Sequence, residues 1–163
     1  MMKKLFTSGR TELAGNHTDH QNGRILASAI DLGITAVCQA NSSPVVHVRA
    51  EGFEDIEIKT TQLSVRPAEF GTPKALIRGV LAAFSELGLE IGGFDAEVTS
   101  SLPIGAGLSS SAAFSVLMGR IVSELFNGGR VEPVVLARAA QQAENKYFGK
   151  PCGLMDQTAS SVG

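Results

Sequence analysis

The sequence predicts an α+β domain in which an antiparallel sheet packs against helices. At 163 residues the chain suits one domain and is long enough to bury a single core. Segments typical of strands come first, and segments typical of helices follow them. Because no repeat, linker or low-complexity tract divides the chain, we expect residues 1–163 to form one unit.

Four short segments are expected to form the sheet. Residues 34–40, 45–50 and 55–60 are rich in β-branched side chains, and turn-forming NSSP and EGFE stretches separate them. These segments look like strands of an antiparallel sheet. A further strand is expected near residues 94–101.

Three helices are expected to cover this sheet. The first has Thr72 as its N-cap, Pro73 at its first position, apolar residues at helical spacing, and Gly88 at its end. The second, at residues 112–126, is apolar on nearly every side and should therefore be central and buried. The third begins at residues 132–133 and ends near residue 149.

Composition limits the class of partner and the compartment. The chain carries 14 basic and 16 acidic residues, so neither a nucleic acid nor an anionic membrane is an expected partner. Residues 98–119 lack charge, but their proline, glycines and hydroxyls argue against a bilayer span. Cys38 and Cys152 are expected to be free thiols, and the N-terminus lacks a signal sequence. These features favour a cytoplasmic protein that binds small molecules.

The stretch PIGAGLSSSAA, at residues 103–113, lies between an expected strand and an expected helix. The first backbone amides of such a helix are unpaired and favour an anion such as phosphate. Gly105 and Gly107 allow close approach of backbone to phosphate oxygens, while serines 109–111 can cap the helix, donate to phosphate or bind Mg²⁺. The spacing matches neither the Walker loop nor the dinucleotide fingerprint. A capped turn that binds nothing is the alternative.

Two other polar stretches are candidates for the same site. Residues 9–23, GRTELAGNHTDHQNG, are too polar for a core strand and suggest a turn that presents hydrogen bonds to a polyol. There are two alternatives for this stretch. One is a transition-metal site formed by His17, Asp19 and His20, and the other is a solvated loop. Residues 143–157 contain Glu144 near a helix end, and Asp156, for which a helix N-cap is the alternative role.

Taken together, the three stretches resemble the GHMP kinase superfamily and, within it, the galactokinases. The resemblance covers nearly the whole chain, with the motifs in matching order and spacing. It implies a ribosomal-protein-like mixed or antiparallel sheet packed with helices, with a left-handed β-α-β phosphate-binding unit. It also implies transfer of the γ-phosphate of ATP, with Mg²⁺, to the anomeric hydroxyl of an aldose.

The resemblance also implies a role for each matching residue. Asp156 resembles the catalytic base and Arg10 its cationic neighbour, which would keep the aspartate ionised. Ser111 and Glu144 resemble the magnesium ligands. The implied sugar contacts are Asn16, His17, Asp19, Gly153 and Asp156. The implied ATP phosphate contacts are Gly105, Ala106, Gly107, Leu108, Ser109, Ser110 and Ser111.

Three departures from the galactokinase pattern bear on the substrate and the length. Asn16 stands where a glutamate is usual, and His20 where a tyrosine is usual. Replacing an anion by an amide removes repulsion toward a carboxylate, so galacturonate is an alternative substrate. The family is normally more than twice as long, so we expect a fragment without its C-terminal domain, weakly active alone and prone to self-association. A non-catalytic sensor of sugar and ATP is the other alternative.

Overall fold

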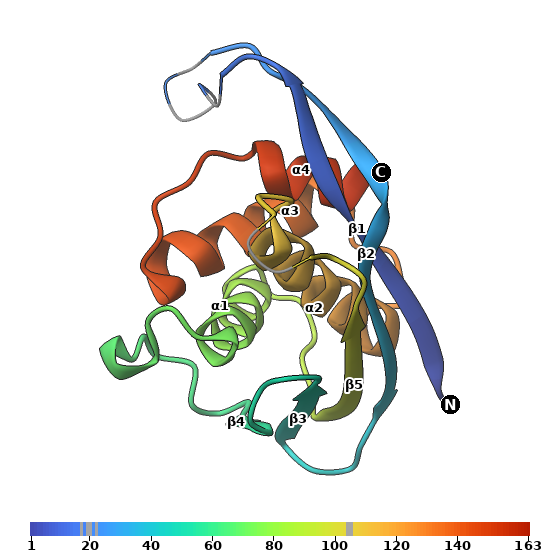
Figure 1. Ribbon diagram of the computed structural model, residues 1–163. Helices are drawn as coiled ribbons and strands as arrows, with labels where there is room; N and C mark the ends of the chain where they lie inside the picture. The colour runs from blue at the N-terminus through green and yellow to red at the C-terminus, as the bar shows by residue number, and fades with distance from the viewer. Residues whose placement is uncertain (17, 19–20, 22, 104–105) are drawn as a thin grey trace.

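The computed structural model describes residues 1–16, 18, 21, 23–103 and 106–163. Its five-stranded sheet has the order β1-β2-β5-β3-β4 (Figure 1). The strands are β1 (Lys3–Ala14), β2 (Leu26–Ala40), β3 (Val45–Ala50), β4 (Ile56–Lys59) and β5 (Phe94–Ser100). All neighbouring pairs run antiparallel except β3 and β5, which run parallel. The sheet is therefore mixed, as the family resemblance implies, and the one parallel pair departs from the antiparallel sheet expected from the strand pattern.

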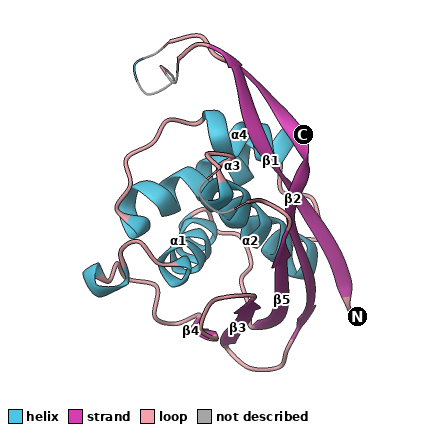
Figure 2. Cartoon of the chain, viewed as in Figure 1, coloured by secondary structure: helices cyan, strands magenta, loops and turns pink. Residues whose placement is uncertain are grey.

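The helices pack together against the sheet (Figures 1 and 2). They are α1 (Pro73–Glu86), α2 (Ser110–Phe126), α3 (Pro133–Gln142) and α4 (Met155–Val162), with a 3-10 turn η2 (Pro67–Glu69) and a π-helical segment η3 (Ala143–Phe148). This arrangement confirms the α+β prediction. Within the described residues, no helix is long and apolar enough to cross a membrane.

Local sequence explains where the helices begin and end. The hydroxyl of Thr72 accepts a hydrogen bond from the amide of Ala75, so the predicted cap and proline start of α1 are confirmed. The helix expected at 133–149 is α3 continued by η3, and Gly149 ends it in the left-handed region at φ 80°. Both cysteines are free thiols, as expected.

Contacts between elements fix the place of η3 and the buried core. A Cβ added at Gly79 in α1 would come within 2.7 Å of the Ala143 Cα atom, so glycine lets α1 pack directly against η3. The core lies where the inward side chains of β2 to β5 meet α1 and α2. As predicted, α2 is central, with Val116, Leu117 and Ile121 fully buried.

The hairpin of β1 and β2 corrects the sequence-based prediction. Residues 9–14, expected in a turn, belong to β1, and β2 begins at Leu26 rather than at residue 34. The pairing is interrupted by a register shift between Ser8 and Arg10. A polar strand is stable here because the charge of Arg10 is paired, as described below. In Figure 1 the hairpin extends beyond the helices.

Candidate functional site

An ion pair joins the first strand to the last helix. Arg10 in β1 donates from Nε to Oδ1 of Asp156 in α4 at 2.7 Å. The Arg10 side chain is 8% exposed and the Asp156 side chain 16%, so solvent screens this pair only weakly. Two residues predicted to act together, one near each end of the chain, therefore lie side by side.

The same arginine contacts the glycine-rich turn before α2. Its Nη1 donates to the carbonyl of Gly107 at 2.8 Å, and its backbone amide donates to the carbonyl of Leu108 at 3.3 Å. A Cβ at Gly9 would come within 2.7 Å of the Leu102 side chain and 3.0 Å of that Leu108 oxygen, so glycine at residue 9 favours the close approach of β1 to the turn. Gly107 itself has a φ of 68°. The ion pair and the turn thus form one hydrogen-bonded unit.

Ser109, the N-cap of α2, completes this unit. Its hydroxyl donates to Oδ2 of Asp156 at 2.5 Å and makes no capping bond to the helix. The first hydrogen bond of α2 runs from the amide of Ala113 to the carbonyl of Ser109, so the amides of residues 110–112 precede the helical ladder. Those amides and the helix dipole favour an anion at this end of α2.

Glu144 supplies a second, deeply buried carboxylate. It lies in the π-helical segment η3 and is 1% exposed, and its Oε1 atom lacks a hydrogen-bond partner. Burial raises the pKa of the Glu144 carboxyl, although the Lys150 ammonium and hydrogen bonds from the Ser111 and Cys152 side chains act in the opposite direction. Segments of π-helix occur frequently at functional sites.

These residues fit a magnesium ion. An unpartnered buried carboxylate oxygen is costly by itself, and Mg²⁺ takes oxygen ligands such as the Glu144 carboxylate and the Ser111 hydroxyl. The Ser111 side chain already lies against Glu144. In contrast, the described part of the chain contains no group of three or more histidine, cysteine or acidic residues that could hold a metal ion.

The remaining predicted residues are distributed as follows. Asn16 is exposed in the hairpin turn at φ 52°, and Gly153 precedes α4 with intermediate exposure. Ala106 is exposed in the turn, and Ser110 is the first residue of α2. The alternative of an N-cap role for Asp156 is wrong, because Leu154 caps α4 and Asp156 lies in the first turn. His17, Asp19, His20 and Gly105 lie outside the described residues.

Sequence reasoning missed two contacts at this site. The hydrogen bond from Ser109 to Asp156 had no signal in the sequence, because three consecutive serines offer equivalent hydroxyls. The thiol of Cys152 faces Glu144, and burial together with that carboxylate raises the pKa of Cys152 to about 12. Cys152 therefore carries a protonated, weakly reactive thiol at neutral pH.

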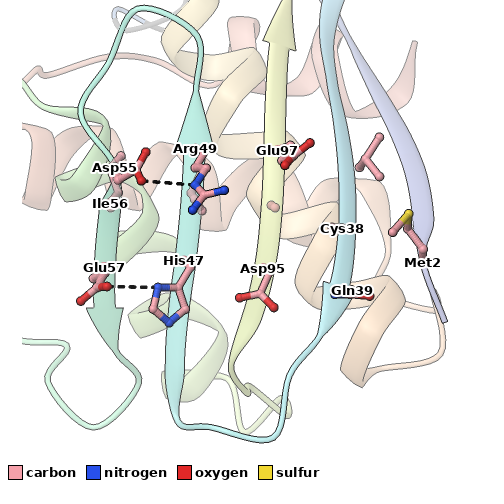
Figure 3. Close-up of a pocket in the computed structure, with 13 residues that line it drawn as sticks. Met2, Cys38, Gln39, His47, Arg49, Asp55, Ile56, Glu57, Asp95 and Glu97 are labelled. Carbon is pink, nitrogen blue, oxygen red and sulfur yellow. Dashed lines mark hydrogen bonds and ion pairs between the residues drawn. The ribbon is translucent and has the colours of Figure 1, made fainter.

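A hollow of about 480 Å³ lies elsewhere, over strands β2 to β5 (Figure 3). Its polar lining includes two close pairs of side chains, His47 with Glu57 at 3.3 Å and Arg49 with Asp55 at 3.2 Å. These side chains are 43–72% exposed, which is typical of a solvated sheet face. Because neither Arg10 nor Asp156 lines this hollow, we place the candidate site at the turn before α2.

Family models match both halves of the chain. Residues 75–163 match the model of the GHMP kinases N terminal domain, which is more than half of the sequence. The chain belongs to the GHMP kinase family. Residues 5–40 of this GHMP kinase domain also match the galactokinase galactose-binding signature, and that match includes β1 and Arg10.

Individual relatives point to one branch of the GHMP kinases. The galactokinase of Pyrococcus furiosus is 37% identical over 95% of this chain and 42% of its own length, and that of Clostridium tetani is 28% identical over 99% and 41%. The crystal structure of Lactococcus lactis galactokinase complexed with galactose aligns with a TM-score of 0.90 at 29% identity, over 98% of this chain and 42% of that one. The chain thus spans about two fifths of the length of these relatives.

Proposed function

We propose that the protein containing this chain is a galactokinase that transfers the γ-phosphate of ATP to the anomeric hydroxyl of galactose. The observation that carries the proposal is the Asp156 carboxylate, held by Arg10 and Ser109 beside the N-terminus of α2. This arrangement supports a role for Asp156 as the base, beside a helix end that favours anions. The galactose-binding signature and the likeness to a galactose-bound galactokinase support the choice of sugar.

The donor side of the proposed reaction is the turn before α2. The amides of residues 110–112 and the positive end of the helix dipole favour the phosphates of ATP. The glycine at position 107 leaves backbone accessible, since nothing lies within 4 Å of the place a Cβ would take. Phosphoryl transfer depends mainly on such positioning and charge neutralisation.

The acceptor side is Asp156. Its carboxylate accepts the proton of the sugar hydroxyl as that oxygen forms a bond to the γ-phosphorus and the bond to the ADP oxygen breaks. Arg10 keeps the carboxylate oriented through the 2.7 Å hydrogen bond and offsets negative charge near the transferring group. No other proton carrier is needed for the overall transfer to balance.

Magnesium is part of the proposed reaction, and Ser111 and Glu144 are the residues that would hold it. Without a cation, the carboxylates of Glu144 and Asp156 would repel an incoming triphosphate. The bound ion would supply charge neutralisation of the phosphate oxygens.

Asn16 favours a second candidate substrate. It is exposed and stands at φ 52°, a left-handed conformation that asparagine tolerates well. If this side chain contacts the far end of the sugar, its amide N–H groups could donate hydrogen bonds to a carboxylate there, whereas a glutamate would repel that carboxylate. Galacturonate is therefore the second candidate substrate.

An assay of ADP release by the full-length protein tests the proposal. Galactose, galacturonate and N-acetylgalactosamine are compared at equal concentration with Mg²⁺ and ATP. We expect the largest kcat/KM with galactose, whereas a preference for galacturonate would support the Asn16 alternative. Sugar-dependent ATP binding without ADP release would contradict a kinase and indicate a sensor.

A further inference from the structure

Ser109 has an unusual backbone conformation for a serine. It adopts φ 58° and ψ 49°, the left-handed region, and Asn16 is the one other non-glycine residue with positive φ among the described residues. This region costs an L residue about 1–2 kcal/mol. Strain of this kind persists where the surrounding structure requires it, and it is concentrated at functional sites.

The side chain of Ser109 does not make the usual N-cap hydrogen bond. An N-cap serine normally accepts a hydrogen bond from an amide of the first turn, but Ser109 makes no such bond to α2. Its hydroxyl instead donates to Oδ2 of Asp156 at 2.5 Å. Hydrogen bonds of this short length are typical of a hydroxyl paired with an ionised acceptor.

Arg10 and Ser109 hold opposite oxygens of the same carboxylate. Arg10 donates to Oδ1 and also to the carbonyl of Gly107, two residues before Ser109. The carboxylate is therefore fixed at both oxygens, and both donors belong to or bind the glycine-rich turn. A carboxylate held at one oxygen could still rotate about its Cβ–Cγ bond.

We propose that Ser109 is a positioning residue, which orients the Asp156 carboxylate toward the acceptor hydroxyl and joins it to the phosphate-binding turn. This role rests on the proposed kinase function. It differs from that of a phosphate ligand, since the partner of the hydroxyl is the base. Loss of the hydroxyl should then slow the chemical step rather than weaken ATP binding.

The variant Ser109→Gly tests this role without backbone strain, because glycine adopts the left-handed region readily. In the full-length protein we expect kcat for sugar-dependent ADP release to fall about tenfold to a hundredfold, as for a lost hydrogen bond to a charged group. The KM for ATP should stay close to that of the wild type. A raised KM for ATP with unchanged kcat would overturn the proposal and indicate a phosphate ligand.

The matched control is Ser123→Ala at the other end of α2. Ser123 is buried and accepts a hydrogen bond from the amide of Val131 at 3.2 Å. This variant removes a serine hydroxyl near the opposite end of α2, and it should lower thermal stability without changing kcat. A fall in kcat equal to that of Ser109→Gly would show a general structural effect and would overturn the proposal.

A double-mutant cycle separates this inference from the proposed function. The unfolding midpoints of Ser109→Gly, Asp156→Ala and the double variant are compared with the wild type, because alanine leaves no acceptor for the Ser109 hydroxyl. We expect non-additive shifts, and additive shifts would overturn the contact regardless of activity. A wild-type protein that releases no ADP with any sugar would instead contradict the kinase itself, and the cycle would still test the contact.

Discussion

The substitution Glu144→Gln should stabilise the metal-free protein while it damages the site. Glu144 is 1% exposed, and its Oε1 atom has no hydrogen-bond partner. Glutamine has nearly the same shape but carries no charge, so the desolvation cost of the carboxylate disappears. An unsatisfied buried group costs about 1–3 kcal/mol and more when it is charged, and glutamine removes only the extra cost of the charge, which we take as about 1 kcal/mol or more. At about 2–4 °C per kcal/mol for a domain of this size, the midpoint should rise by at least about 2–4 °C.

The gain should depend on pH in a defined direction. Burial raises the pKa of Glu144 above its ordinary value of 4.5. The folded state therefore binds the proton more tightly than the unfolded state, and wild-type stability falls as the pH rises from 4.5 through the raised pKa. The advantage of Glu144→Gln should be absent below pH 4.5 and complete above the raised pKa.

Thermal unfolding of the full-length protein between pH 4 and pH 8, with and without Mg²⁺ and ATP, measures both effects. Magnesium and ATP should raise the wild-type midpoint more than that of Glu144→Gln, because the variant lacks the proposed metal ligand. The control Glu97→Gln, at an exposed position of β5, should leave the midpoint nearly unchanged. A metal-free Glu144→Gln variant that is less stable than the wild type at neutral pH would refute the reasoning.

Two further predictions concern buried ion pairs. Arg10→Ala should lower kcat less than Asp156→Ala does, because the role of Arg10 is electrostatic. The ADP-release assay measures both variants. A larger loss of kcat in Arg10→Ala would indicate that Arg10 clamps the substrate. Arg78→Met removes the closest charged partner of Glu69, which Arg78 binds at 2.7 and 2.8 Å, and leaves Glu69 with Arg66 at 3.8 Å. The variant should destabilise the fold by about 1.5–3 kcal/mol in denaturant unfolding at neutral pH, as for lost hydrogen bonds to a charged group. The hydrogen bond from Arg78 lowers the pKa of Glu69 below its ordinary value of 4.5. The stability that the pair contributes is therefore present above pH 4.5 and is lost as the pH falls through the lowered pKa. A loss of stability in Arg78→Met that is as large at pH 3 as at neutral pH would contradict this.

The regular elements with strong local signals could be predicted from the sequence. Thr72 and Pro73 specify the start of α1 through a hydroxyl cap and a fixed φ, both of which are local. The strand β1 could not be predicted, because polar residues such as Arg10 are stable in it only through partners distant in sequence. The carbonyls of Gly107 and Leu108 and the carboxylate of Asp156 are such partners.

In the candidate site, too, the sequence predicted some contacts and missed others. The motifs indicated that Arg10 and Asp156 act together, and the structure places them in contact. The sequence could not show which serine meets the base, since that depends on the left-handed backbone at Ser109. The unpartnered oxygen of Glu144 also depends on tertiary packing, because Gly79 brings α1 against the π-helical segment.

The most direct test of the proposed function is turnover by Asp156→Ala in the full-length protein. Sugar-dependent ADP release and ATP binding are measured on the same preparation, with Ser123→Ala as the control. The proposed mechanism predicts that turnover falls by about 10²–10⁴-fold, the usual contribution of a general base, while ATP still binds. Near-normal turnover of Asp156→Ala would contradict it.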